Sequence, residues 1–376
     1  MADRRYDVAI IGAGIIGASV AYHLARRGCR DVAVLEKEST AGTGSTAKAA
    51  GGIRAQFSSE INVRLSLLSL PDFERFSQEM GVPAPFYQVG YLWIATRPED
   101  ARLFERNAAL HRRLGMNVEL LDARGVAARA PFVRTDDVLA GAFHARDGYA
   151  SPADFLQGYC ARAKELGVEF LYGHEVVGRE GDRLLTPAGP VRASRVVLAT
   201  GAWSGRVGRI LGCDIPVEPV RRQCFVTQPL PELPHPVPMT IDFATGVYLH
   251  SESGGLLVGR AEREEPPGFN ETPDAGFVER TAALAVQRVP ILERAEVRSV
   301  WAGLYEVTPD NHPVLGPVGS GLYAACGFSG HGVMHAPVAG RLLAELLTEG
   351  KTSLDISCLR LERFREGRLI PETNVL

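Results

Sequence analysis

The feature that most constrains this chain is a glycine pattern near its beginning. Residues 7–11 are almost entirely apolar, as expected of a strand buried on both faces of a parallel sheet. Gly12, Gly14 and Gly17 follow with the spacing Gly-x-Gly-x-x-Gly, and residues 15–27 then show helical spacing. Glycines in such a turn allow a tight bend, close approach of a pyrophosphate and close packing of the helix on the strand. The pattern predicts a Rossmann-type domain that binds a dinucleotide.

An acidic residue lies at the distance that such a domain requires. A second β-rich run, residues 32–35, ends in Glu36, about 20 residues after the third glycine, where a carboxylate binds a ribose hydroxyl. A carboxylate there would repel the 2′-phosphate of NADP. FAD and NAD remain as candidate ligands.

The next segment favours FAD. Residues 42–54 are too rich in Gly, Ala, Ser and Thr for a strand, and small residues let the backbone lie close to a large ligand. Ser45 and Thr46 are candidate donors to phosphate oxygens. A flexible surface loop is the alternative interpretation of this composition.

Length and charge narrow the other possibilities. A chain of 376 residues exceeds what one hydrophobic core usually supports, so two domains are expected. A net charge of −3 gives no basic field for nucleic acid or anionic lipid, and we expect neither as a partner.

The cysteines and the apolar N-terminal stretch predict a cytoplasmic protein. No Cys-x-x-Cys pair occurs, which argues against a zinc site and a disulfide framework. The apolar residues 8–25 carry the glycine pattern and lack a cleavage-type ending, so they predict neither a signal peptide nor a membrane span. The cysteines are expected to be reduced: Cys29, Cys160, Cys213, Cys224, Cys326 and Cys358.

Several motifs together resemble those of the D-amino acid oxidase superfamily, especially its glycine oxidase, sarcosine oxidase β-subunit and proline dehydrogenase β-subunit branch. The resemblance runs nearly end to end. Its motifs are the N-terminal glycine pattern, Ser45-Thr46, Gly51-Gly52-Ile53-Arg54-Ala55-Gln56-Phe57, Ala199-Thr200-Gly201-Ala202-Trp203, Trp301-Ala302-Gly303 and Ala325-Cys326-Gly327-Phe328-Ser329-Gly330-His331-Gly332.

The resemblance implies an α/β plus α+β fold with a discontinuous Rossmann-type FAD-binding domain and a mostly antiparallel substrate domain. The implied FAD domain comprises residues 1–85, 146–215 and 306–376, and the substrate domain comprises 86–145 and 216–305.

Local patterns agree with that architecture. A helix is predicted over 152–166 and an apolar strand over 195–200, which stops at a glycine as ligand-facing strand ends do. Short runs at 224–228, 247–250 and 256–260 suit an antiparallel sheet. Near the C-terminus, a strand over 322–325, a turn over 327–332 and a helix over 337–347 would present a second helix N-terminus to the ligand. By the resemblance, residues 175–177 form the strand whose backbone contacts adenine.

By the same resemblance, FAD is held without a covalent bond. The implied cofactor-binding residues are Gly12, Gly14, Ile15, Ile16, Gly17, Glu36, Lys37, Ser45, Thr46, Ala50, Gly51, Gly52, Val176, Thr200, Gly201, Trp203, Gly303, Phe328, Gly330, His331, Gly332 and Met334.

Four residues are candidates for binding a substrate. Arg54 follows the small-residue segment, and its guanidinium could clamp a carboxylate with two hydrogen bonds. Tyr248 and Tyr305 are expected to line the cavity and donate to a carboxylate oxygen. Arg260 is a weaker candidate for a second positive charge, as are Arg221 and Arg222.

The histidines predict no metal site, and none is assigned as a catalytic base. They lack ligand spacing with cysteines or carboxylates. His331 sits in a glycine turn at a helix start, where contact with the flavin or capping of the helix is the better interpretation. The catalytic residue stays unassigned.

Departures from the family pattern also carry information. Gly303 stands where monomeric sarcosine oxidases have a flavin-linked cysteine, and Leu257 stands where they have a lysine used in oxygen activation. Tyr305 replaces an arginine of glycine oxidases, which favours a larger N-substituted glycine or a proline-like substrate over glycine.

The leading hypothesis is FAD-dependent oxidation of the C–N bond of a small amino acid or N-alkyl amino acid to an imine, which water then hydrolyses. Oxygen or another acceptor would take the electrons. One alternative is a flavin-dependent 2-hydroxy acid dehydrogenase, because Arg54 would bind such acids equally well. Another is a flavin-bearing β-type subunit of a larger amine dehydrogenase, so homo-oligomers and hetero-oligomers both stay open.

Overall fold

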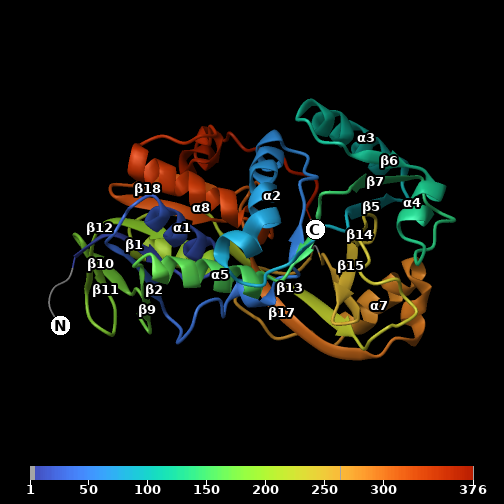
Figure 1. Cartoon of the computed structure of the whole chain (residues 1–376), viewed down its shortest axis with the longest axis horizontal. Coiled ribbons are helices and arrows are strands. Elements are labelled where there is room, and N and C mark those ends of the chain that lie inside the picture. The colour runs from blue at the N-terminus through green and yellow to red at the C-terminus, as the bar shows by residue number, and fades with distance from the viewer. Residues whose placement is uncertain (1–4, 263, 376) are drawn as a thin grey trace.

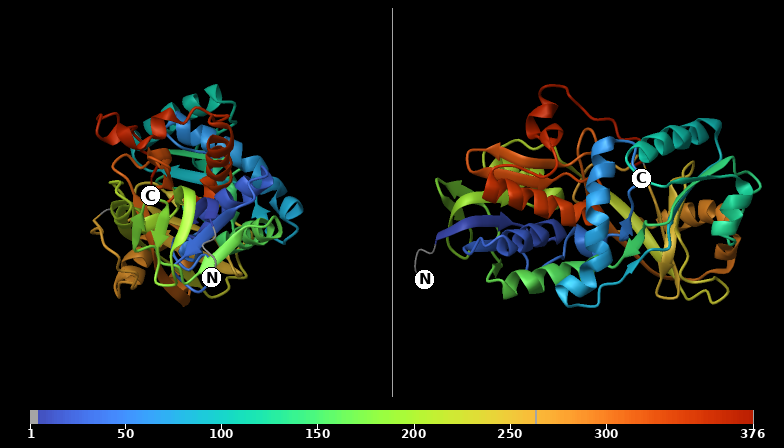
Figure 2. Two further views of the ribbon diagram at one scale, coloured as in Figure 1. Left: turned by 90° about the vertical axis from the view of Figure 1, so that its left-hand side faces the viewer. Right: turned by 45° about the horizontal axis from the view of Figure 1, so that its top comes forward.

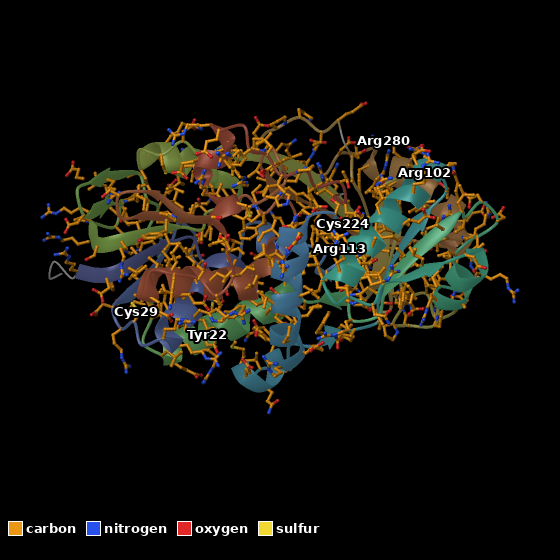
Figure 3. The ribbon with its side chains drawn as sticks, turned by 90° about the horizontal axis from the view of Figure 1, so that it is seen from above. Tyr22, Cys29, Arg102, Arg113, Cys224 and Arg280 are labelled. Atoms are coloured by element: carbon orange, nitrogen blue, oxygen red, sulfur yellow. The ribbon has the colours of Figure 1, made fainter. Side chains whose placement is uncertain are left out.

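The computed structural model describes residues 5–262 and 264–375. Two eight-stranded sheets lie at opposite ends of an elongated molecule, and a small three-stranded sheet lies between them (Figure 1). Figure 3 shows the same arrangement from above, with Tyr22 and Cys29 at one end, Arg102 and Arg280 at the other and Cys224 between them.

The first sheet draws its strands from the N-terminal, middle and C-terminal parts of the chain. They are β1 (Arg5–Ile11), β2 (Val32–Glu36), β9 (Glu169–Tyr172), β10 (Gly178–Glu180), β11 (Arg183–Leu185), β12 (Val191–Leu198), β18 (Val314–Gly319) and β19 (Leu322–Cys326). The order is β10-β11-β12-β1-β2-β9, and β19, which pairs with β12 and β18, extends it. The pairs of β1 with β12 and β2, of β2 with β9 and of β12 with β19 are parallel.

Helices bury this sheet on both faces. On one face, α1 (Ile15–Arg26) packs against α5 (Pro152–Glu165) and α8 (Gly332–Glu349), and α2 (Glu60–Met80) crosses them near the middle of the molecule (Figure 2). On the other face lie α6 (Ser204–Ile210) and the short turn η5 (Leu361–Phe364). Val8, Ala9 and Ile10 of β1 are fully buried, which explains why this strand is apolar on both faces.

The second sheet has the order β17-β13-β16-β15-β14-β5-β7-β6, and only the pair of β14 with β5 is parallel. Its strands are β5 (Tyr91–Ala95), β6 (Glu119–Leu121), β7 (Ala140–His144), β13 (Glu218–Thr227), β14 (Met239–Asp242), β15 (Val247–Glu252), β16 (Gly255–Arg260) and β17 (Val297–Val307). One face packs on α4 (Ala123–Arg129) and α7 (Phe277–Arg288), and α3 (Pro98–Arg113) packs on the other.

The predicted fold class is confirmed, with three local corrections. Residues 175–177 form no strand but an extended connection after β9. The helix predicted over 337–347 begins earlier, at Gly332. Residues 42–54, predicted to lack strand structure, contain β3 (Gly52–Ile53), which joins β4 (Phe86–Tyr87) and β8 (Gly148–Ala150) in the small sheet. The exact bounds of the two domains stay a prediction.

All six cysteines are free thiols. Within residues 5–262 and 264–375, no helix combines the length and the apolar character needed to cross a bilayer. The cytoplasmic location stays a prediction.

Candidate flavin and substrate site

A cavity of about 570 Å³ lies where the two sheets meet. It is lined by the carboxyl ends of β1, β2 and β12, by the N-termini of α1 and α8, and by the face of the second sheet that carries Tyr91 and Tyr248. The carboxyl edge of a parallel sheet is where α/β folds bind ligands. The volume is typical of ligand pockets, which span roughly 300 to 1,000 Å³.

At one end of this cavity, the backbone of the glycine turn packs closely against neighbouring backbone. Gly12 has a φ of +105°, and a Cβ atom there would lie 2.4 Å from the carbonyl oxygen of Ala199. A Cβ atom on Gly17 would lie 2.0 Å from the carbonyl oxygen of Gly12. Glycine at both positions therefore lets α1 start directly against β1, with its N-terminus toward the cavity. Gly17 acts through this packing and does not line the cavity.

Glu36 is fixed at the end of β2, where the sequence predicted a ribose-binding carboxylate. Its Oε2 accepts a hydrogen bond from the Ala13 amide at 2.8 Å, and its Oε1 accepts one from the Glu38 amide at 3.0 Å. Next to it, the Lys37 ammonium lies 4.6 Å from the centre of the Trp203 ring. Glu36, Lys37 and Trp203 all line the cavity, an arrangement suited to the adenosine half of a dinucleotide.

Ser45 and Thr46 line the cavity, but their hydroxyls have partners within the protein. The Ser45 hydroxyl donates to the Leu304 carbonyl at 2.6 Å, so its hydrogen is not available to a phosphate. The Thr46 oxygen accepts from the Ile15 amide at 3.1 Å and thereby ties the small-residue segment to the start of α1. Of the two predicted phosphate donors, Thr46 alone keeps its hydroxyl hydrogen uncommitted within the described residues.

The residues present fit FAD. A Cβ atom on Gly14 would meet one neighbour, the Thr46 hydroxyl at 3.3 Å, and the φ of Gly14 is an ordinary −75°. This contact is tight but would be relieved by a small shift of the Thr46 side chain, so the fold alone requires glycine less strictly here than at Gly12 or Gly17, whereas a pyrophosphate at the α1 N-terminus needs that space. The far end of the cavity is lined by Gly51, Gly303 and residues 330–334, which leave room for a flat ring.

Arg54 reaches this far end as a buried cation. Its side chain is 3% exposed, and its guanidinium lies 3.8 Å from the centre of the Phe57 ring. Nη1 donates to the Gln56 carbonyl at 2.5 Å and Nη2 to the Asn374 carbonyl at 2.6 Å. Burial lowers the pKa of Arg54, but a guanidinium stays charged in proteins. In the described part of the chain no carboxylate lies within ion-pair distance of it, although the charges of Glu372 and Asp147 act on it from further away. A ligand anion would therefore find an open partner here.

Three tyrosines surround the space next to Arg54. Tyr91, Tyr248 and Tyr305 all line the cavity, and Tyr91 and Tyr248 are buried. Burial raises the pKa of each of the three phenols. They are therefore neutral hydroxyls that can donate to a carboxylate or accept from an amine.

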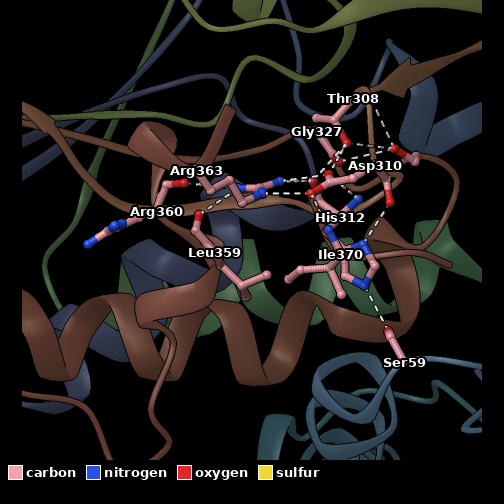
Figure 4. Close-up of polar contacts among 10 residues, drawn as sticks. Ser59, Thr308, Asp310, His312, Gly327, Leu359, Arg360, Arg363 and Ile370 are labelled. Carbon is pink, nitrogen blue, oxygen red and sulfur yellow. Dashed lines mark hydrogen bonds and ion pairs between the residues drawn. The ribbon is translucent and has the colours of Figure 1, made fainter. Parts of the chain in front are cut away.

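The C-terminal segment reaches across the fold to hold Arg54. Figure 4 shows its first anchor, the buried Arg363 of η5, whose guanidinium pairs with both oxygens of Asp310 at 2.8 and 2.9 Å. The backbone carbonyl of Asp310 in turn lies 2.7 Å from His312 Nδ1, and His312 Nε2 lies 2.8 Å from the Ser59 hydroxyl. This buried network joins η5 to the start of α2.

A second anchor lies immediately before the contact with Arg54. The Glu372 carboxylate accepts hydrogen bonds from the amides of Ser58 at 2.8 Å and Ser59 at 3.2 Å, and from the Asn62 side chain at 3.1 Å. These hydrogen bonds hold the pKa of Glu372 below its usual value although burial opposes them. Two residues later, the Asn374 carbonyl meets Arg54. The C-terminal segment therefore holds one nitrogen of the Arg54 guanidinium in place.

Replacing Glu372 with alanine is expected to weaken carboxylate binding about tenfold while leaving flavin content near that of the wild type. The change frees the Asn374 carbonyl from its place beside Arg54, so the guanidinium loses one of the two carbonyls that orient it, and a tenfold weaker Kd corresponds to about 1.4 kcal/mol. The donors left unpaired at Ser58, Ser59 and Asn62 lower the stability of the fold instead. The KM for the substrate and the Kd of a carboxylate inhibitor measure the loss of binding. The control is Glu366→Ala, which removes an exposed carboxylate from the same segment. An unchanged inhibitor Kd in the Glu372 variant would contradict the proposal that the C-terminal segment orients Arg54.

Glu306 is a cavity-lining carboxyl that the sequence analysis did not identify. Its Oε2 accepts a hydrogen bond from the Gly327 amide at 2.8 Å, and it faces Gly332 at the start of α8. Burial raises the pKa of Glu306 to about 7, against the lowering effect of hydrogen bonds from the Gly327 and Phe328 backbone. The group therefore titrates in the physiological range.

The raised pKa makes a signed prediction about stability. A carboxyl whose pKa rises on folding stabilises the fold fully below about pH 4.5 and loses that contribution as the pH rises to about 7. Flavin-free Glu306→Gln should therefore match the wild type near pH 4 and exceed its unfolding free energy by about 3 kcal/mol at pH 8. Urea denaturation between these values measures the difference. Buried histidines such as His335, whose pKa is lowered to about 3, affect both proteins equally. A difference that does not vary with pH would refute the prediction.

The structure brings most of the predicted site residues to one cavity. Gly17 and Phe328 are instead buried in the packing beneath it. Arg260 lies outside the cavity, where it faces the Thr245 carbonyl and Glu262, so it is not placed to bind a substrate. The predicted residues that line the cavity are Gly12, Gly14, Ile15, Ile16, Glu36, Lys37, Ser45, Thr46, Ala50, Gly51, Gly52, Arg54, Val176, Thr200, Gly201, Trp203, Tyr248, Gly303, Tyr305, Gly330, His331, Gly332 and Met334.

Several cavity residues carried no sequence signal. Tyr91 and Met239 reach the site because β5 and β14 pair in parallel across a long sequence separation. Lys48 lines it with its ion-pair partner Glu271, 2.6 Å away.

His331 precedes α8 and makes no side-chain cap. Its ring packs edge-on against Phe57, with ring centres 4.8 Å apart. Burial and the nearby Arg54 hold the pKa of His331 well below its usual value, so this ring is neutral. Among the described residues, no cluster of His, Cys, Asp and Glu could hold a metal ion.

Comparison with known proteins places the chain among flavoenzymes. The family model described as "DAO: FAD dependent oxidoreductase" matches residues 7–346. Glycine oxidase of Geobacillus kaustophilus is 32% identical over 375 residues, which cover 96% of this chain and 97% of that protein. Mitochondrial dimethylglycine dehydrogenase of Rattus norvegicus is 31% identical over 97% of this chain, but the chain spans only 45% of that protein.

Solved structures agree with these relatives. L-proline dehydrogenase from P. horikoshii superimposes with a TM-score of 0.92 at 32% identity, covering 98% of this chain and 100% of that one. Glycine oxidase from Geobacillus kaustophilus gives a TM-score of 0.87 at 31% identity, covering 96% and 99%.

Proposed function

The chain belongs to the DAO family of FAD-dependent oxidoreductases, and from that premise we propose that it oxidises the C–N bond of a small amino acid or N-substituted amino acid to an imine. The observation that carries the proposal is the Arg54 guanidinium, which is buried, lines the cavity and forms no ion pair within the described residues. The names of the relatives support it, since glycine oxidase, dimethylglycine dehydrogenase and L-proline dehydrogenase all take amino acids.

Different residues of the cavity would bind the substrate carboxylate and exclude water. Arg54 would bind the carboxylate with the part of its fork that the Gln56 and Asn374 carbonyls leave open, while the buried phenols of Tyr248 and Tyr305 would donate to it. Bound FAD would supply the two-electron acceptor. The apolar wall around the tyrosines would exclude water and favour the neutral form of the amine.

Anaerobic reduction of the bound flavin tests this function. The purified, flavin-loaded chain is mixed with glycine, sarcosine, longer N-alkyl glycines, proline and D-amino acids, and the loss of flavin absorbance is followed. Bleaching by at least one amino acid, with imine hydrolysis products, is the expected result. Bleaching by 2-hydroxy acids alone would instead support a hydroxy acid dehydrogenase. A flavin that no small acid reduces would favour a β-type subunit that works only in a complex.

Reoxidation of the reduced enzyme then separates an oxidase from a dehydrogenase. Rapid return of the flavin absorbance in air would identify oxygen as the acceptor. Return only with an added artificial acceptor would support a dehydrogenase. The same preparation, examined by size-exclusion chromatography, gives the oligomeric state of the chain.

A further inference from the structure

A second guanidinium enters the same cavity from the other sheet. Arg222 lies on β13 in register with Gly303 of β17, and both residues line the cavity. The Arg222 guanidinium lies 5.2 Å from the centre of the Tyr305 ring. Its Nη1 donates to the Arg221 carbonyl at 3.0 Å, while its buried Nε has no partner among the described residues.

Arg222 differs from the arginines near it, because each of those lies close to a carboxylate. Arg221 pairs with Glu265 at 2.9 Å and also donates to the Thr272 carbonyl. Arg260 faces Glu262 at 3.9 Å and lies outside the cavity. Within the described residues, Arg222 has no carboxylate within ion-pair distance.

Other cavity charges do not supply the missing partner. Glu271 already pairs with Lys48, and the Glu306 carboxyl accepts a hydrogen bond from the Gly327 amide, which follows β19. The negative phosphates of FAD belong at the glycine turn, at the other end of the cavity. A sheltered guanidinium without a counter-ion is costly, so an anionic ligand group would relieve the cost.

Arg54 and Arg222 both act on one phenol. Positive charge from Arg222 and from Arg54 each lowers the pKa of Tyr305, although burial raises it overall. Arg222 also acts on Tyr248, whereas Arg54 acts on Tyr91. Tyr305 therefore senses both positive charges, and all three residues line the same cavity.

We propose that Arg222 forms a second anion subsite, so that the preferred substrate is an amino acid with two carboxylates, one bound at Arg54 and the other at Arg222. N-carboxyalkyl amino acids and acidic amino acids belong to this class. The inference rests on the proposed function and narrows its substrate. It uses the same C–N chemistry and adds no reaction step.

Paired substrates that differ by one carboxylate test the proposal. Sarcosine is compared with N-(carboxymethyl)glycine, and alanine with aspartate and glutamate, as the ratio of kcat/KM for diacid over monoacid. The wild type should prefer a diacid, and Arg222→Gln should lower that ratio at least tenfold. Arg221→Gln, which alters the adjacent paired arginine, should leave the ratio as in the wild type. A monoacid preference, or equal losses for both substrates in Arg222→Gln, would overturn the proposal.

A binding measurement separates this proposal from the proposed function. Non-reducing ligands are titrated into the oxidised, flavin-loaded protein, and the change in the flavin spectrum is followed. Succinate and glutarate should bind at least tenfold more tightly than acetate or propionate, and Arg222→Gln should remove the difference. That result would support the subsite even if no amino acid reduced the flavin. Equal affinity for mono- and dicarboxylates in the wild type would refute the subsite whether or not amino acids are oxidised.

Discussion

Arg54→Met is expected to lower kcat/KM about 30- to 1,000-fold for any carboxylate substrate. The buried guanidinium makes no ion pair in the described part of the chain and faces the cavity, so its removal deletes the charge that would bind the carboxylate. Losing one partner of a buried, charged hydrogen bond costs about 2 to 4 kcal/mol, and each 1.4 kcal/mol is a factor of ten. Steady-state kinetics with the best substrate of the bleaching panel gives the value.

Two further observations keep this prediction interpretable. Arg54→Lys retains the positive charge but not the planar guanidinium with its paired donors. Its kcat/KM should therefore lie between the values of the wild type and of the methionine variant. Flavin content and the unfolding midpoint must be measured for both, since each change also alters the hydrogen bonds that Arg54 donates to the Gln56 and Asn374 carbonyls. A well-folded, flavin-loaded methionine variant with wild-type kcat/KM would remove Arg54 from the substrate site.

Gly14→Val is expected to give a folded protein that has lost most of its FAD. A Cβ atom at Gly14 would lie 3.3 Å from the Thr46 hydroxyl, a tight contact that a small shift of this side chain would relieve, and the local φ suits any residue. The valine side chain would fill the space that a pyrophosphate needs. Overpacking of this kind costs about 1 to 3 kcal/mol, which corresponds to roughly 5- to 150-fold weaker FAD binding.

The flavin absorbance per chain and the Kd for FAD added to the flavin-free protein measure the effect. Gly319→Val is the matched control, because Gly319 lies on β18 away from the cavity and a Cβ atom there makes ordinary contacts with Leu322 at 3.5 Å and beyond. Both variants should keep the circular dichroism of the wild type. Full flavin content in Gly14→Val would show that the pyrophosphate does not lie at this turn.

The glycine turn and Glu36, which lie in segments close together in the sequence, could be predicted well. A buried strand, a glycine turn and a helix follow one another in the chain, and their geometry is set by hydrogen bonds and packing among neighbours in sequence. Glu36 then falls at the end of the adjacent strand by the same local logic. The confirmed fold class and FAD cofactor depend on this segment and on the family motifs.

The sequence does not predict which face of the second sheet lines the cavity. That face determines which arginine reaches it. Arg221 and Arg222 are adjacent on β13, so their side chains point to opposite faces of the sheet. The sequence shows the alternation but not its phase relative to the cavity. For the same reason the sequence could not rank Arg260 against Arg221 and Arg222 for a second positive charge, and the structure places Arg260 outside the cavity, facing Thr245 and Glu262.

Contacts between distant segments were also beyond the sequence. The carbonyl of Asn374 reaches Arg54 across 320 positions in the chain, and a backbone carbonyl has no residue signature. Ser45 was assigned to phosphate on its residue type, but the Leu304 carbonyl of a remote strand accepts its hydrogen. Glu306 reads as an ordinary strand residue until folding buries its carboxyl beside Gly327.

A crystal structure of the FAD-loaded chain with a bound, non-reducing carboxylate would locate the substrate carboxylate relative to Arg54 and the flavin. It should show the ligand carboxylate paired with the Arg54 guanidinium, which still donates to the Gln56 and Asn374 carbonyls, and FAD with its pyrophosphate against Gly14. A carboxylate bound elsewhere in the cavity, with Arg54 contacting only protein atoms or the flavin, would contradict the account.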